Sequence, residues 1–143
     1  MLNIRHTGIV VSDIDRSIDF YTNFLGFKIK VDMVESGDYI DNFLDLSDTV
    51  VRTVKMSLDC GGMVELLHFI SHTEEIDTER RITSIGCSHI ALTVENLKEM
   101  YNALLEAGVR FNNPPQISAD GSARVAFCKD PDGTFIELVE ELK

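Results

Sequence analysis

Two histidines and two glutamates occupy matching places in the two halves of this chain. His6 and His89 each begin a segment rich in β-branched and small residues, and Glu65 and Glu137 each lie within a later apolar segment. Imidazole nitrogens and carboxylate oxygens together suit a divalent first-row metal and leave positions open for water or substrate. We therefore expect one divalent ion per chain, and Ni²⁺, Co²⁺, Zn²⁺ or Mn²⁺ all fit these ligands.

An internal duplication accounts for the matching places. Each histidine is followed by a strand-like segment, a helix-like stretch and a glycine. Gly26 lies 20 residues after His6, and Gly108 lies 19 residues after His89 (26 − 6 and 108 − 89). Self-similarity of this kind indicates a repeated structural unit, so function is expected where the two copies meet.

Each half is expected to fold as β-α-β-β-β, which makes the chain an α+β protein. Residue periodicity and turn residues set the boundaries. In the first half they predict strands over 3–11, 27–34, 50–58 and 63–70, with a helix from 14 to 25. In the second half they predict strands over 87–94, 122–128 and 134–140, with a helix that contains Leu97 and Leu104 and leads to Gly108, and Pro114-Pro115 limits any further strand. Ser12-Asp13 and Asn96 with Glu99 are residue types that cap helices.

The chain of 143 residues is expected to form a single domain. Its first module covers 1–70 and its second covers 87–143. The connector, 71–86, contains four acids and two arginines and is expected to be solvated.

Side-chain alternation along the strands predicts which face carries the histidines. His6 shares a face with Gly8 and Val10, while Ile9 and Val11 lie on the other face, which is expected to receive a helix. The segment that begins at His89 has the same pattern. Both histidines are therefore expected on the face that no helix covers.

The two glutamates are flanked by apolar residues, where a carboxylate is costly unless something compensates its charge. Any one of the four residues alone is more often structural, but their occurrence at equivalent places in both copies favours a metal site. His68 falls on the face opposite Glu65, and His72 lies in the connector, so both are expected to be structural or solvated. Arg52 and Arg124 are the best candidates to hold an anionic substrate tail, although salt bridges are the more common role.

Composition excludes several functions. The formal charge of −11 disfavours nucleic acid and anionic membranes as partners. No apolar run is long enough to span a membrane, and no signal peptide is evident at the N-terminus. Cys60, Cys87 and Cys128 lack metal-binding spacing and are expected to be free thiols in a cytoplasmic protein.

Three motifs resemble the vicinal-oxygen-chelate superfamily, which includes glyoxalases, bleomycin-resistance proteins and extradiol dioxygenases. The motifs are Arg16–Gly26, Ser88–Asn96 and Asp130–Glu141, and the chain is most similar to glyoxalase I. The resemblance implies paired βαβββ modules that form a cupped mixed sheet with helices on its outer face. It also implies a homodimer, and metal ligands at the four positions that the duplication singles out.

The same resemblance implies a lyase or isomerase that moves a proton next to the carbonyl of a small molecule through a metal-stabilised enediolate. Glu65 and Glu137 are then the candidate bases as well as ligands. Alternatives are an isomerase similar to methylmalonyl-CoA epimerase, whose strand motif resembles Val64–Leu67, and an antibiotic-binding module without turnover.

Three residues that contact glutathione in bacterial glyoxalase I differ here. Val10 stands where that group commonly has arginine, Phe69 where it has asparagine, and the loop Ala119–Ser122 lacks the usual basic residue. Unmatched polar groups on a substrate reduce affinity steeply. The methylglyoxal–glutathione adduct is therefore expected to be a poor substrate.

Overall fold

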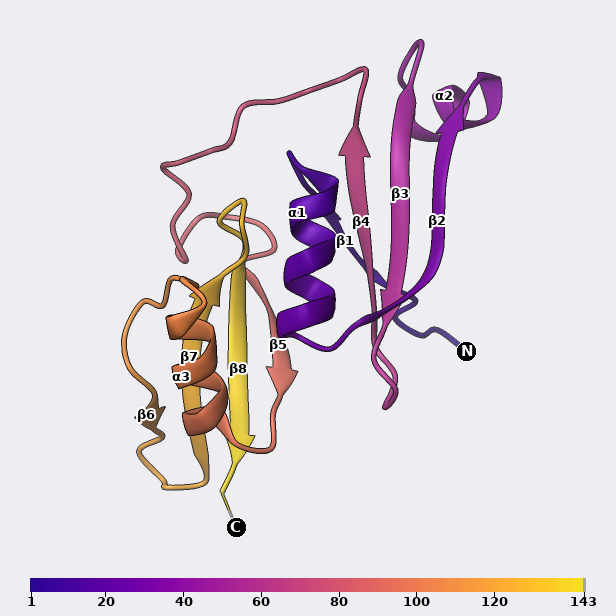
Figure 1. Ribbon diagram of the computed structural model, residues 1–143. Helices are drawn as coiled ribbons and strands as arrows, with labels where there is room; N and C mark the ends of the chain where they lie inside the picture. The colour runs from indigo at the N-terminus through magenta and orange to yellow at the C-terminus, as the bar shows by residue number, and fades with distance from the viewer. Residues whose placement is uncertain (143) are drawn as a thin grey trace. The chain divides into compact units, whose positions relative to one another are not determined.

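The computed structural model describes residues 1–142 and divides the chain into two compact units, Met1–Ile76 and Asp77–Lys143. The division falls within the acidic connector. Each unit contains its own four-stranded mixed sheet and helices (Figure 1), which confirms the expected α+β fold class.

The first unit follows the β-α-β-β-β order, with one additional helix. Its elements are β1 (Thr7–Val10), α1 (Ile14–Asp19), the π-helical η1 (Phe20–Phe24), β2 (Lys28–Ser36), α2 (Asp38–Leu44), β3 (Val50–Ser57) and β4 (Met63–Phe69). The strand order is β1-β4-β3-β2. β1 and β4 are parallel, and the other neighbouring strands are antiparallel.

The second unit repeats this topology. Its elements are β5 (His89–Thr93), α3 (Leu97–Glu106), β6 (Gln116–Ile117), β7 (Ala123–Lys129) and β8 (Phe135–Glu141). The strand order is β5-β8-β7-β6, again with the first and last strands parallel. β6 has two residues because it directly follows Pro114-Pro115, which cannot donate to a strand ladder.

The helices α1 and α3 begin where the sequence predicted. The Asp13 carboxylate accepts a hydrogen bond from the Arg16 N–H at 3.1 Å, which caps α1. The Asn96 side chain caps α3 by accepting from the Glu99 N–H at 3.1 Å. The reciprocal bond differs from a capping box, since Glu99 accepts from the Asn96 side-chain amide and not from its backbone.

One face of each sheet packs against a helix. α1 lies against β4, and α3 lies against β7 and β8. Ile9 and Val11 are buried, as the alternation predicted, whereas Val10 between them is 59% exposed. In the second unit Ile136 and Leu138 are fully buried on the face next to α3. The residues that alternate with these, including both glutamates, therefore lie on the face opposite the helix.

Some boundaries differ from the prediction. The first strand is Thr7–Val10 and not 3–11, so His6 precedes it. The sequence gave no indication of α2, which has seven residues and buries only Ile40, because so short a segment contains little helical periodicity. The first helix also changes to π-helical hydrogen bonding at Phe20. Among residues 1–142, no helix has the length and apolar character needed to cross a membrane.

Replacing Asn96 by alanine is expected to lower the free energy of unfolding by about 1 kcal/mol, because the first turn of α3 loses its cap. Chemical denaturation of the purified variant measures the change. Asn102→Ala, at an exposed position within the same helix, is the matched control and should cause no loss. Equal stability of the Asn96 variant and the parent would contradict this account of the helix start.

Candidate functional site

His6 and Glu65 form a close pair in the first unit. The Nε2 atom of His6 lies 3.1 Å from Oε2 of Glu65, although the residues are 59 positions apart in the sequence (65 − 6). The Glu65 side chain is only 14% exposed, so its carboxylate is largely removed from water.

His89 and Glu137 form the equivalent pair in the second unit. Nε2 of His89 lies 3.0 Å from Oε2 of Glu137, and the Glu137 side chain is 23% exposed. Nδ1 of His89 lies 2.7 Å from the Ser88 hydroxyl, which orients the imidazole so that Nε2 faces the carboxylate. The aromatic ring of Phe127 packs edge-on against the same imidazole, with ring centroids 5.2 Å apart.

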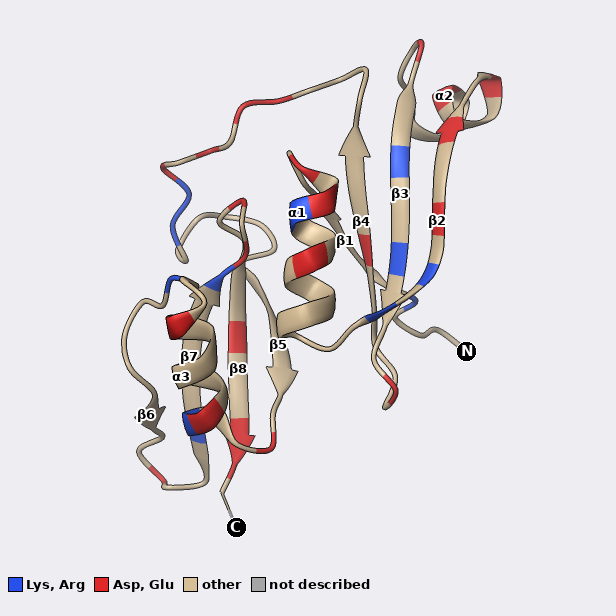
Figure 2. Ribbon diagram, in the orientation of Figure 1, with Lys and Arg blue, Asp and Glu red and all other residues tan. Residues whose placement is uncertain are grey.

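The parallel strand register produces both pairs. Gly8 is the partner of Glu65 in the β1–β4 ladder, and Ala91 is the partner of Glu137 in the β5–β8 ladder. Each histidine lies two residues before that partner, hence on the same face. The partners are small, which leaves space above each glutamate for the imidazole to approach. Figure 2 shows an acidic band within β4 and another within β8.

The donor atoms of each pair fit a divalent metal ion. Nε2 and a carboxylate oxygen converge in both units, and these are the atom types that Zn²⁺, Ni²⁺, Co²⁺ and Mn²⁺ accept. Nδ1 of His6 is buried and has no hydrogen-bond partner among residues 1–142. Within each described unit, no group of three or more His, Cys, Asp or Glu side chains gathers, so each unit supplies a pair.

A lysine that sequence reasoning missed lies beside the first pair. Nζ of Lys55 lies 3.4 Å from Oε1 of Glu65, because Lys55 and Glu65 are directly opposite in the β3–β4 hairpin. The hairpin sequence could have revealed this contact. Strands joined by the turn Leu58–Gly62 pair residues that are equally far from Cys60, and Lys55 and Glu65 are each five residues from it. In the second unit the equivalent position is Phe127, opposite Glu137.

His68 and His72 are structural or solvated, as expected. Nδ1 of His68 lies 3.1 Å from the backbone oxygen of Val11, on the helix-covered face. Nδ1 of His72 lies 2.7 Å from the Ser71 hydroxyl in the exposed connector. The three cysteines are free thiols, and burial raises the pKa of the Cys128 thiol to about 12.

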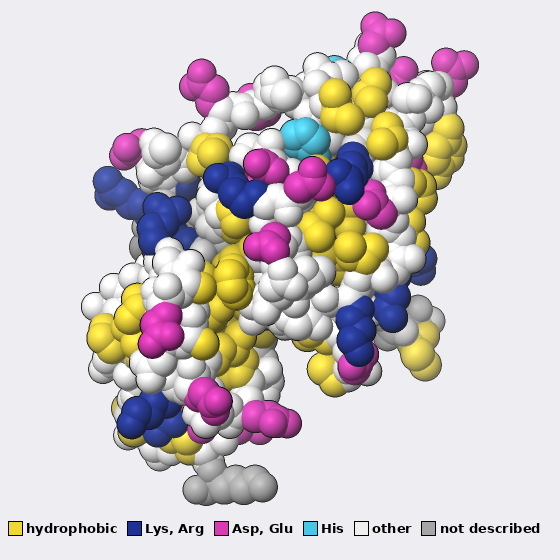
Figure 3. Space-filling model, in the orientation of Figure 1, with side chains coloured by type: hydrophobic (Ala, Val, Ile, Leu, Met, Phe, Trp, Pro, Cys, Tyr) yellow, Lys and Arg dark blue, Asp and Glu magenta, His cyan; other side chains and the backbone are white. Residues whose placement is uncertain are grey.

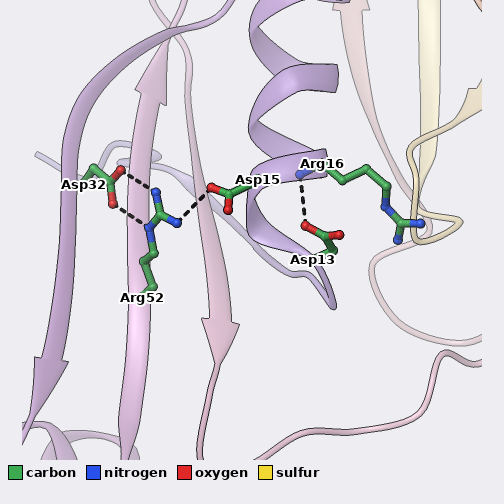
Figure 4. Close-up of polar contacts among 5 residues, drawn as sticks. All are labelled: Asp13, Asp15, Arg16, Asp32 and Arg52. Carbon is green, nitrogen blue, oxygen red and sulfur yellow. Dashed lines mark hydrogen bonds and ion pairs between the residues drawn. The ribbon is translucent and has the colours of Figure 1, made fainter.

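Both arginines form salt bridges on the helix-covered faces. Arg52 donates to both carboxylate oxygens of Asp32 at 2.9 and 2.8 Å and to Asp15 at 2.9 Å (Figure 4). Arg124 donates to Glu140 at 2.7 Å. Their registers place them on the face opposite Glu65 and Glu137, so neither reaches the His–Glu pairs.

Charged side chains of both signs lie on the visible surface. In Figure 3 acidic and basic side chains are interspersed with apolar ones.

The repeated βαβββ unit, with a His–Glu pair on the sheet face opposite its helix, defines a class of proteins, and comparison with known proteins identifies the family. The sequence profile of the Glyoxalase/Bleomycin resistance protein/Dioxygenase superfamily matches residues 3–138. This chain therefore belongs to that superfamily.

Its relatives include lactoylglutathione lyases. The lactoylglutathione lyase of Escherichia coli O157:H7 is 29% identical over 143 residues, which cover 98% of this chain and 93% of that protein. That of Pseudomonas putida is 31% identical, with 95% of this chain and 83% of that protein covered. The crystal structure of a glyoxalase family protein from Bacillus cereus has a TM-score of 0.91 at 23% identity, covering 100% of this chain and 96% of that chain. This last likeness supports the fold.

Replacing Arg52 by methionine is expected to lower the free energy of unfolding at neutral pH by about 1 kcal/mol. The Arg52 hydrogen bond lowers the pKa of Asp32 below its usual value of 3.8. The stabilisation is therefore present above about pH 4 and is lost as the pH falls through the lowered pKa. Denaturation from pH 7 to pH 2 should show the two proteins converging in acid. A difference that stays constant over this range would contradict the assignment.

Proposed function

We propose that this protein is a divalent-metal-dependent lyase or isomerase that moves a proton next to the carbonyl group of a small molecule. The observation that carries the proposal is the repeated His–Glu pair, with Nε2 to Oε2 distances of 3.1 and 3.0 Å in the two units. Membership of the superfamily and the similarity to lactoylglutathione lyases support the reaction class.

In this proposal His6, Glu65, His89 and Glu137 are the ligands of one ion. The neutral imidazoles bind through Nε2, and the carboxylates balance the charge of the cation. When bound, the ion supplies positive charge to the substrate's carbonyl oxygen as negative charge develops there. A homodimer and a cytoplasmic location stay predictions.

A glutamate acts as the base. A carboxylate oxygen of Glu65 or Glu137 takes the proton from the carbon next to the carbonyl and returns it to the product. Both carboxylates are largely shielded from water, which limits exchange of the abstracted proton with solvent. Val10 and Phe69 provide no polar group for glutathione, so the substrate is proposed to differ from the methylglyoxal–glutathione adduct.

Metal analysis tests the ligand set. The purified protein, dialysed against Zn²⁺, Ni²⁺, Co²⁺ or Mn²⁺, is expected to retain about one ion per chain, because two pairs together supply four ligands. His6→Ala and His89→Ala should each lose most of the ion, since each leaves an incomplete set. His68→Ala is the matched control and should retain it, because that imidazole contacts backbone on the other face. Full occupancy in both ligand variants would reject the assignment.

Turnover tests the reaction class. A panel of hemithioacetals, 2-oxo acids and acyl-CoA esters identifies the substrate as the compound that the metal-loaded protein converts to a product. Glu65→Gln or Glu137→Gln, whichever removes the base, should reduce kcat by roughly 10²–10⁴-fold, because an amide cannot accept the proton. Binding measured by calorimetry should be retained. A parent protein that binds a panel compound and never turns it over would instead support an antibiotic-binding module.

A further inference from the structure

The two units differ at one position next to the proposed ligands. Lys55 lies opposite Glu65 in the β3–β4 ladder, and Phe127 lies opposite Glu137 in the β7–β8 ladder. The duplication makes these positions equivalent. The first unit therefore places a cation beside its glutamate, where the second places an aromatic ring.

The contact between Lys55 and Glu65 leaves the ammonium available to a ligand. Nζ is 3.4 Å from Oε1, a long distance for a charged hydrogen bond, and the Lys55 side chain is 29% exposed. The other carboxylate oxygen of Glu65 faces His6. Glu35 lies on the same face, but four residues further along β2 than Val31, the partner of Lys55, and its carboxylate accepts a hydrogen bond from the Thr53 hydroxyl at 2.8 Å. An ammonium has three donors, so one contact to Glu65 does not exhaust its capacity.

Charge balance indicates what that ligand is. Two glutamate carboxylates neutralise one divalent ion, and Lys55 then adds one positive charge next to Glu65. Two cations that share a carboxylate repel each other unless a further anion compensates them. A monoanionic group on the substrate would supply that compensation.

We propose that Lys55 binds the carboxylate of the substrate and that the substrate is a 2-oxo carboxylate, in which this anion is adjacent to the carbonyl. The proposal rests on the proposed function and names the substrate class of the same site. It also fits Val10 and Phe69, because an anion held next to the reacting carbon needs no distant polar anchor.

Lys55 has a different role if it serves only to position Glu65. In that case, replacing Lys55 alters the metal content or weakens the binding of every carbonyl ligand to the same degree. A residue that binds the substrate anion instead discriminates between charged and neutral ligands. Two probes with vicinal oxygen atoms separate the roles: pyruvate, which is an anion, and butane-2,3-dione, which is neutral.

The experiment is calorimetric titration of both probes into Zn²⁺-loaded protein whose metal content has been measured. Lys55→Met removes the charge at similar volume, and Lys55→Arg keeps the charge. Lys55→Gln is a second neutral variant, used if thermal unfolding shows that Lys55→Met is not folded. Lys28→Met is the matched control, because Lys28 forms an exposed ion pair with Asp59 and contacts neither histidine.

Lys55→Met is expected to weaken the binding of pyruvate about tenfold or more, because a charge-assisted hydrogen bond is lost. Its affinity for butane-2,3-dione should be unchanged. Lys55→Arg should keep pyruvate binding within a few-fold of the parent, and Lys28→Met should match it. Three outcomes would each overturn the proposal and leave the proposed function unaffected. They are equal pyruvate affinity in the parent and Lys55→Met, equal loss of affinity for both probes, and a metal-loaded parent that does not bind pyruvate. A parent that retains no divalent ion would overturn the proposed function, and this inference with it.

Discussion

The parallel pairing of the first and last strands in each unit is the constraint on which the site depends. It holds each histidine beside a glutamate that is 59 or 48 residues away in the sequence (65 − 6 and 137 − 89). A slip of one residue in either ladder would turn the glutamate toward the helix and separate the pair. The buried residues Leu66 and Leu138, each next to a glutamate in the sequence, oppose such a slip because it would expose them. The apolar core thus fixes the position of the polar site.

The two units share their backbone topology more closely than the side chains around their glutamates. Both units retain the strand order and the His–Glu distance, yet they surround the glutamate differently. Lys55 is a neighbour that adds charge and hydrogen-bond donors, whereas Phe127 packs against an imidazole and adds neither. The neighbours of the two His–Glu pairs, and not the pairs themselves, therefore make the two units chemically different.

Repetition and alternation were enough to predict the order of strands and main helix along each unit, the helix starts and the face that carries the histidines. They succeeded because Asp13, Asn96 and the buried faces all follow local rules. They failed at α2, where seven residues bury a single isoleucine, and at the start of β1, where His6 lies before the ladder. Lys55 was missed for a different reason. Lys55 matters because it lies opposite Glu65 across the hairpin, and the alternation of side chains along one strand does not reveal a neighbour on the next strand.

A net charge of −11 does not prevent this protein from binding an anion, because distance decides which charges a ligand experiences. At physiological ionic strength, exposed charges farther away than about 8 Å are largely screened. Arg52 and Arg124 are already compensated by acids on the opposite faces, so they contribute little on the side of the glutamates. Lys55, 3.4 Å from Glu65, acts at short range and partly away from water, where the same unit charge has a larger effect. In the proposed site, Lys55 therefore influences the choice of substrate more strongly than the overall charge of the protein does.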